Sequence, residues 1–204
     1  MRSLRFATYL APRLAGTYAA IARHVGEAVG ASTSLSVGSD YDRVPDADVT
    51  FLCGLAYVEL VRNRKVVLHP LAAPVLQGAR FAGRPIYFSD VVVRSDSDIV
   101  SFDDLRGRSW AFNERLSQSG FGVTRHHLAT RGDRAAFFSH VVEAGFHDRA
   151  LRMVVEGEVD AAAIDCHVLA LAIGDDPSLE RRLRVVASLG PSTIQPVVVH
   201  ERVP

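Results

Sequence analysis

Short apolar or β-branched runs alternate with segments of helical periodicity along this chain. The runs predict strands and the periodic segments predict helices, because apolar residues alternate in a half-buried strand and recur every three or four residues in an amphipathic helix. The predicted strands are 5–10, 32–37, 48–53, 66–68, 86–93, 109–112, 136–142, 160–164, 183–187 and 197–200, and the predicted helices are 17–29, 56–64, 119–130, 147–156 and 168–173. This alternation is typical of α/β proteins with parallel sheets.

The same series of strands and helices starts again after residue 90. Two series in tandem predict two lobes, each a mainly parallel sheet flanked by helices. Residues 1–88 are expected to form lobe 1, to which 191–204 return, and residues 89–190 to form lobe 2. Ligands of such folds bind in a crevice at the carboxyl ends of the strands, so we expect a binding site between the lobes.

The charge balance argues against a nucleic-acid partner. The 204 residues include 23 basic and 23 acidic side chains, whereas nucleic-acid binders are usually visibly basic. No apolar run reaches the roughly 18 residues that a membrane span needs. The N-terminal MRSLRFATYLAP lacks the apolar core of a signal peptide. We therefore expect a periplasmic protein if a leader was removed, and a cytoplasmic one if the chain is complete.

Two serines and a glycine follow the predicted strand 109–112, in the stretch Ser117-Gln118-Ser119-Gly120. A helix that begins there has unpaired backbone N–H groups and a partial positive charge at its start. Serine hydroxyls add donors, and Gly120 has no Cβ to obstruct a close approach. The stretch is therefore suited to an oxyanion. The simpler alternative is that Ser117 or Ser119 only caps the helix.

Two longer stretches place this turn in a wider pattern. They are YFSDVVVRSDSDIVSFDDLRGRSWAFNERLSQSG and AGFHDRALRMVVEGEVDAAAID, which together span about residues 84–167. They resemble the phosphate/phosphonate-binding components of ABC importers, which are two-lobed solute-binding proteins of the periplasmic type II fold. FATYLAP and ADVTFLCGLAYVEL fit the same family more loosely.

The resemblance implies a non-catalytic protein for ABC-type uptake. It would hold phosphate, a phosphonate or a phosphate ester between its lobes, as a monomer, with ABC permease subunits as partners and no cofactor. The ligand contacts that it implies are Ser117, Gln118 and Ser119 around the anion, His147 as a further donor, Tyr87 facing the ligand, Asp165 at the ligand's other end, and Tyr57 and Tyr9 from the other lobe.

Each of these residues has a structural alternative. The tyrosines could be interface aromatics with their hydroxyls in water. His147 could only cap its helix, and Asp165 could be the N-cap of the helix that follows it.

Two other functions remain open. The same fold hosts enzymes of pyrimidine and menaquinone precursor synthesis, for which His147 with Asp165, or Cys166 with His167, are the candidate pairs. Adjacent residues on a helix point in different directions, so the second pair is a poor dyad. A cytoplasmic ligand-sensing domain is the other alternative. No His, Cys or Asp cluster has the spacing of metal ligands.

Overall fold

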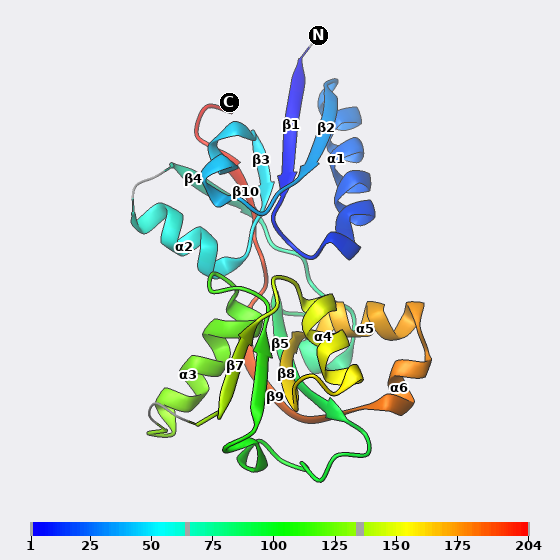
Figure 1. Cartoon of the computed structure of the whole chain (residues 1–204). Helices are drawn as coiled ribbons and strands as arrows, with labels where there is room; N and C mark the ends of the chain where they lie inside the picture. The colour runs from blue at the N-terminus through cyan, green and yellow to red at the C-terminus, as the bar shows by residue number, and fades with distance from the viewer. Residues whose placement is uncertain (1, 64–65, 134–136, 204) are drawn as a thin grey trace. The chain divides into compact units, whose positions relative to one another are not determined.

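A computed structural model describes residues 2–63, 66–133 and 137–203. The chain forms two compact units (Figure 1). Unit 1 comprises the residues up to Pro85 together with those from Ile194 onward, and unit 2 is Ile86–Thr193. Each unit contains a five-stranded sheet flanked by helices, which confirms the predicted α/β architecture. Among the described residues, no helix is long and apolar enough to cross a membrane.

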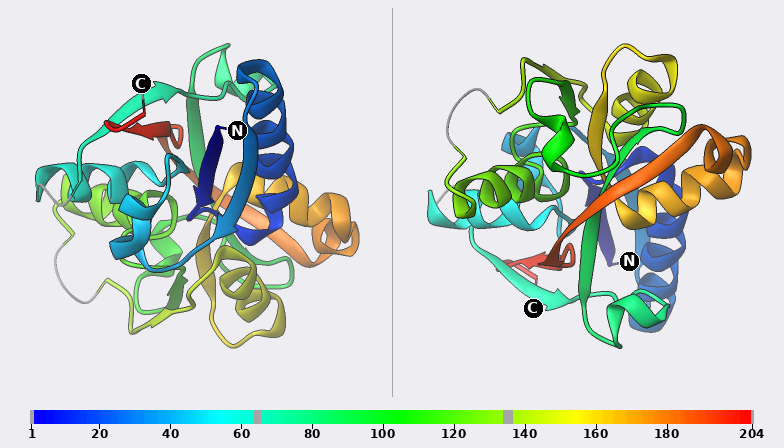
Figure 2. Two further views of the ribbon diagram at one scale, coloured as in Figure 1. Left: turned by 90° about the horizontal axis from the view of Figure 1, so that it is seen from above. Right: turned by 90° about the horizontal axis from the view of Figure 1, so that it is seen from below.

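Unit 1 is built on a sheet with the strand order β2-β1-β3-β10-β4. Its strands are β1 (Ser3–Thr8), β2 (Ser32–Val37), β3 (Val49–Phe51), β4 (Leu68–Ala72) and β10 (Val197–His200), and its helices are α1 (Ala15–Val29) and α2 (Gly54–Arg62). Helix α1 lies against β1 and β2 (Figures 1 and 2). Tyr18 of α1 stacks on Phe51 of β3 with 4.4 Å between the ring centroids. The apolar face of α1 and the side chains of the sheet beneath it form the core of the unit.

Unit 2 has a sheet with the strand order β7-β6-β8-β5-β9. Its strands are β5 (Ile86–Arg94), β6 (Ser109–Phe112), β7 (His140–Glu143), β8 (Ala161–Asp165) and β9 (Leu183–Thr193), and its helices are α3 (Val123–Thr130), α4 (His147–Glu156), α5 (Cys166–Asp175) and α6 (Ser178–Arg182). The inward side chains of β5, β6 and β8 form a continuous buried cluster that includes Val91, Trp110 and Ala161.

Each sheet is mainly parallel, as predicted, with one strand reversed: β10 in unit 1 and β5 in unit 2. In unit 1, β1 pairs in parallel with β2 and β3, whereas β10 is antiparallel to β3 and β4. In unit 2, β6 pairs in parallel with β7 and β8, whereas β5 is antiparallel to β8 and β9. Each reversed strand is the first strand after the chain crosses from one unit to the other: β5 where it enters unit 2, and β10 where it returns to unit 1.

Several predicted elements shift at their ends. The predicted helix 119–130 consists of a π-helical turn, Gln118–Gly122, followed by helix α3. The predicted strand 66–68 is displaced to β4, and α6 has no counterpart among the predictions. The predicted end of one helix at Arg64 and the predicted start of one strand at Ala136 lie outside the described residues.

Asp48 connects the first strand of unit 1 to the last segment of the chain. It accepts hydrogen bonds from the Arg5 backbone N–H at 2.8 Å and from the guanidinium groups of Arg5 and Arg202, at 3.2 and 3.0 Å. Burial alone would raise the pKa of Asp48, but the hydrogen bonds from the two arginines outweigh it and lower this pKa to about 2.

We predict that Asp48→Asn destabilises the protein by roughly 1–2 kcal/mol near neutral pH, because it removes charge-assisted hydrogen bonds that solvent partly screens. The folded-state pKa of Asp48 is depressed, so this contribution is present above about pH 4 and is lost as the pH falls toward 2. Urea unfolding at several pH values measures both effects.

Asp46→Asn is the matched control, because the Arg43–Asp46 pair is exposed on both sides. It should change the free energy of unfolding by less than about 0.5 kcal/mol. Equal losses in the two variants, or a loss for Asp48→Asn that does not shrink in acid, would contradict the assignment.

Candidate functional site

The serine turn follows β6 in unit 2. The Oγ of Ser117 accepts a hydrogen bond from the Gly120 backbone N–H at 3.2 Å, so Ser117 caps the π-turn. Ser117 and Ser119 are both only 3 % exposed. These hydroxyls are buried together with a group from another element, His147.

A chain of hydrogen bonds runs from this turn to the start of α4. The hydroxyls of Ser117 and Ser119 lie 3.2 Å apart, and the Oγ of Ser119 lies 2.7 Å from the Nε2 of His147. His147 is the first residue of α4 and shares its buried face with Ala150, Leu151 and Val154, at positions i, i+3, i+4 and i+7. The amphipathic pattern of α4 is therefore what turns the imidazole inward.

The imidazole of His147 is neutral near pH 7. Burial lowers its pKa to about 4, because water no longer solvates the charged form, and the nearby Asp165 carboxylate opposes this shift only in part. The Nδ1 atom is buried and has no hydrogen-bond partner among the described residues.

Asp165 ends β8 and is 1 % exposed. Its Oδ1 accepts a hydrogen bond from the His167 backbone N–H at 3.2 Å, so it is the N-cap of α5, as the structural alternative predicted. The same oxygen lies 2.6 Å from the Nδ1 of His167, within the range of an ion pair but without the angle of a hydrogen bond. Its charge nevertheless reaches His147.

Further polar atoms beside the turn are buried without a protein partner among the described residues. They include the Oγ of Ser89, which lies opposite Asp165 in the β5–β8 register, and the Oδ1 of Asn113, which packs over Gly120. Buried polar atoms are nearly always hydrogen-bonded, so atoms of this kind are the ones that a bound polar ligand or water satisfies. Strand register brings Ser89 here, and no sequence signal identifies it.

Gln118 connects the turn to β9. Its Nε2 donates to the Oγ of Ser192 at 3.3 Å, and Ser192 lies opposite Tyr87 in the β5–β9 register. Tyr87 is 1 % exposed, within β5 rather than before the strand. The structure therefore places Gln118 and Tyr87 at the end of the sheet where the chain enters and leaves unit 2. Ser192 is a contact that the sequence did not indicate.

The other two predicted tyrosines belong to unit 1. Tyr9 follows β1, stacks on Tyr41 with 5.2 Å between the ring centroids, and lines a hollow of about 740 Å³ on that unit. Burial raises its pKa. Tyr57 lies in α2 and is half-buried. Six of the predicted residues thus lie in unit 2, and Tyr9 and Tyr57 do not share that unit.

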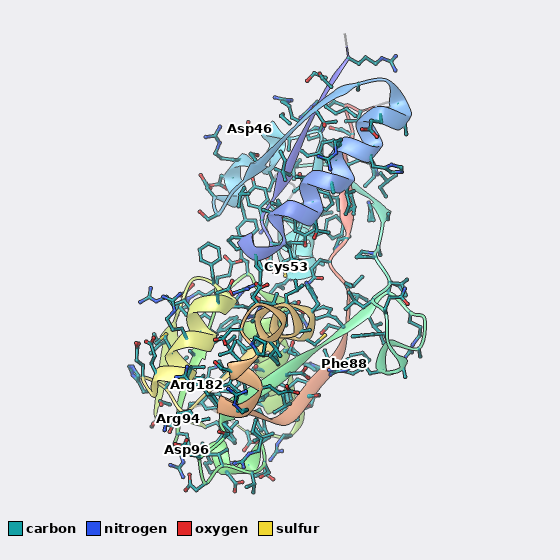
Figure 3. The ribbon with its side chains drawn as sticks, turned by 90° about the vertical axis from the view of Figure 1, so that its right-hand side faces the viewer. Asp46, Cys53, Phe88, Arg94, Asp96 and Arg182 are labelled. Carbon is teal, nitrogen blue, oxygen red and sulfur yellow. The ribbon has the colours of Figure 1, made fainter. Side chains whose placement is uncertain are left out.

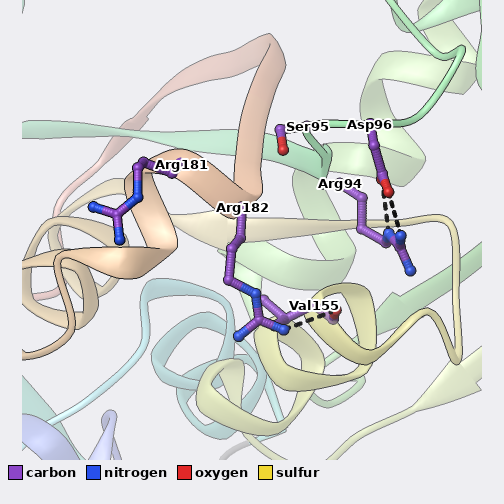
Figure 4. A pocket seen from close by; sticks show the side chains of 6 residues that line it. All are labelled: Arg94, Ser95, Asp96, Val155, Arg181 and Arg182. Atoms are coloured by element: carbon purple, nitrogen blue, oxygen red, sulfur yellow. Dashed lines mark hydrogen bonds and ion pairs between the residues drawn. The ribbon is translucent and has the colours of Figure 1, made fainter.

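Another hollow, of about 240 Å³, lies on unit 2 at the Arg94 end of β5. Three arginines are among the residues that line it (Figures 3 and 4). Arg94 pairs with both carboxylate oxygens of Asp96, and Arg182 donates to the Val155 carbonyl at 3.4 Å, near the end of α4. These contacts stabilise the fold locally, and none of the described residues that line this hollow has a buried, unpartnered polar atom like those beside the serine turn.

The Ser119–His147 contact does not form a catalytic triad. In a triad a carboxylate accepts a hydrogen bond from the Nδ1 of the histidine, which orients the ring and stabilises its cation. Here Nδ1 has no such partner among the described residues, and the Oδ1 of Asp165 contacts His167 instead. In the described part of the chain, no three His, Cys, Asp or Glu side chains gather as metal ligands. The arrangement suits the binding of a polar group.

Comparisons with known proteins agree with this geometry. Residues 6–204 match the family model of the periplasmic substrate-binding protein of phosphonate ABC transporters. Among solved structures, a binding protein component of an ABC phosphonate transporter from Pseudomonas aeruginosa has a TM-score of 0.78 and 18% identity, over 100% of this chain and 70% of that one.

Two further structures share the fold. PhnD1 from Prochlorococcus marinus, solved in complex with methylphosphonate, has a TM-score of 0.79 and 16% identity, over 98% of this chain and 77% of that one. The aliphatic sulphonate binding protein SsuA from Escherichia coli has a TM-score of 0.66 and 15% identity, over 98% and 62%.

We predict that Gly120→Ala destabilises the turn. An added Cβ would lie 2.1 Å from the Oδ1 and 3.2 Å from the backbone N of Asn113, and the Asn113 side chain is itself buried. Urea unfolding should show a loss of about 1–3 kcal/mol. Gly174→Ala is the matched control, because nothing lies within 4 Å of its Cβ position, and it should be neutral or slightly stabilising. Equal stability of the two variants would contradict the packing.

Proposed function

We propose a binding role for the serine turn of this chain, which belongs to the family of periplasmic substrate-binding proteins of phosphonate ABC transporters. The ligand is a phosphonate or a related phosphorus oxyanion. Ser117 and Ser119 hold its oxygens, and His147 orients the hydroxyl of Ser119. The observation that carries this proposal is the buried hydrogen-bond chain that joins these three side chains in unit 2.

The turn can present several donors to an anion. When Nε2–H of His147 donates to the Oγ of Ser119, the hydroxyl proton of Ser119 is available for a ligand oxygen. The Ser117 hydroxyl can donate likewise, because its oxygen already accepts from the Gly120 N–H. The first N–H groups of a helical turn also lack partners within the turn. Donors of this kind bind oxyanions without forming a covalent intermediate.

The protein acts without catalysis on its ligand. The hydrogen bonds of Ser119, His147 and Asp165 suit recognition, since they omit the carboxylate–imidazole contact of a nucleophilic triad. The methylphosphonate held by PhnD1 supports the ligand class, and the family role implies permease subunits as partners in the periplasm. No cofactor is needed for this role.

We predict that Ser119→Ala weakens the binding of methylphosphonate by roughly 10- to 100-fold, the value of one hydrogen bond to a charged group. Isothermal titration calorimetry measures the affinity. Ser117→Ala should lower the affinity as well, and should also lower stability because the cap of the turn is lost.

Ser139→Ala serves as the control, since Ser139 is exposed in the same unit and its backbone N–H bond to Arg108 is retained. Parallel titrations with sulfate and methanesulfonate measure the selectivity of the site for phosphorus oxyanions over sulfur oxyanions. Wild-type affinity in Ser119→Ala would remove the turn from the binding site.

A further inference from the structure

The described hydrogen-bond partners of the serine hydroxyls carry no permanent positive charge. In the described residues, none of the hydrogen bonds or ion pairs given for Ser117, Ser119 or His147 involves arginine or lysine. Arg115, the nearest arginine in the sequence, lies 3.6 Å from Glu143 and its side chain is 75% exposed. Arg115 and Arg125 lie over the ring of Phe121 in the same turn, with their Cζ atoms 6.0 and 5.3 Å from its centroid, rather than on the serine hydroxyls. The contacts of these hydroxyls in the described residues therefore offer an anion dipoles and no full charge.

The surroundings also carry negative charge. Asp165 is almost fully buried at the end of β8, and its charge acts on His147. An anion buried near a carboxylate is unfavourable unless a positive charge is added. A proton that enters with the anion is the smallest charge that can compensate it.

His147 is the group best placed to accept that proton. The charged groups that act on it are Asp165 on β8, His167 on α5 and Asp148 on α4. The other elements packed against α4 are β5, β6 and the rest of α5. β6 has no titratable residue, and β5 carries Tyr87, Asp90, which accepts from Ser188, and Arg94, which pairs with Asp96. α5 also carries Cys166 and Asp175, and none of these groups is among the charges that act on His147.

The other titratable groups near the turn, Asp165 and His167, already contact each other, with 2.6 Å between the Oδ1 of Asp165 and the Nδ1 of His167. His147, in contrast, has one ring nitrogen on Ser119 and the other buried with no partner among the described residues.

We propose that the oxyanion binds together with one proton, which the imidazole of His147 takes up. This inference rests on the proposed function. In the imidazolium both ring nitrogens carry protons, so Nε2 must donate to the Oγ of Ser119. Ser119 then directs its own proton away from His147, toward the ligand. Proton uptake thus sets the direction of the hydrogen-bond chain as well as balancing the charge.

The charge of the ligand determines the pH dependence. Burial keeps the pKa of His147 at about 4 without ligand, and an anion within about 4–6 Å raises it. Between these two pKa values the complex holds one more proton than the separate components. The affinity for a ligand of fixed charge therefore falls about tenfold for each unit of rising pH in that window, and is constant below it.

Calorimetry with methylphosphonate in two buffers of different ionisation enthalpy, near neutral pH, measures the protons taken up on binding. Wild-type protein and His140→Gln, whose exposed histidine lies in β7, should take up nearly one proton more than His147→Gln. Protonation of the ligand itself contributes equally to all three proteins and cancels in the comparison. Equal uptake in wild type and His147→Gln would overturn the inference while binding itself stands.

Imidazole ¹⁵N NMR of the wild-type protein tests the same point without a variant. Saturation with methylphosphonate should move both ring nitrogens of His147, assigned through its backbone resonances, to imidazolium shifts. A ring that stays neutral in the complex would overturn the inference. Absence of any binding to the wild-type protein would instead overturn the proposed function.

Discussion

The hydrogen bond between Ser119 and His147 holds the candidate site together. It is 2.7 Å long, and both side chains are buried, so bulk water does not compete for it. It joins the turn after β6 to the first residue of α4, and α3 and β7 lie between these two points in the chain. Gly120 makes this possible, because any Cβ there would collide with Asn113 and push the turn away.

A buried serine–histidine pair can serve nucleophilic catalysis or the binding of an anion, and the surroundings of His147 favour binding. A nucleophilic serine needs a histidine that a carboxylate orients and that accepts a proton during the reaction. Here the nearest buried carboxylate caps α5 and contacts His167. In the proposed site, His147 therefore supports a set of donors around an anion, and in the inferred binding step its protonation follows the charge that the ligand brings.

The turn is also connected to the strands that carry the chain between the units. Gln118 donates to Ser192 on β9, opposite Tyr87 on β5, and Thr193 is the last residue of unit 2. The backbone N–H of Ile194 then donates to the Pro85 carbonyl at 3.0 Å. The serine turn is therefore tied directly to the strand by which the chain leaves unit 2.

The sequence by itself determined the local elements. The bounds of β6, α4 and β10 agree with the predicted ranges, because periodicity and capping depend on neighbours within a few residues. The family pattern also indicated the serine turn and His147 before any geometry was known. The tertiary structure alone decided the reversed strand in each sheet and the approach of Ser89 and Ser192 to the site, since strand pairing joins residues far apart in the chain. It also decided the charge of His147, because the pKa of an imidazole depends on burial and on neighbours that only the folded chain assembles.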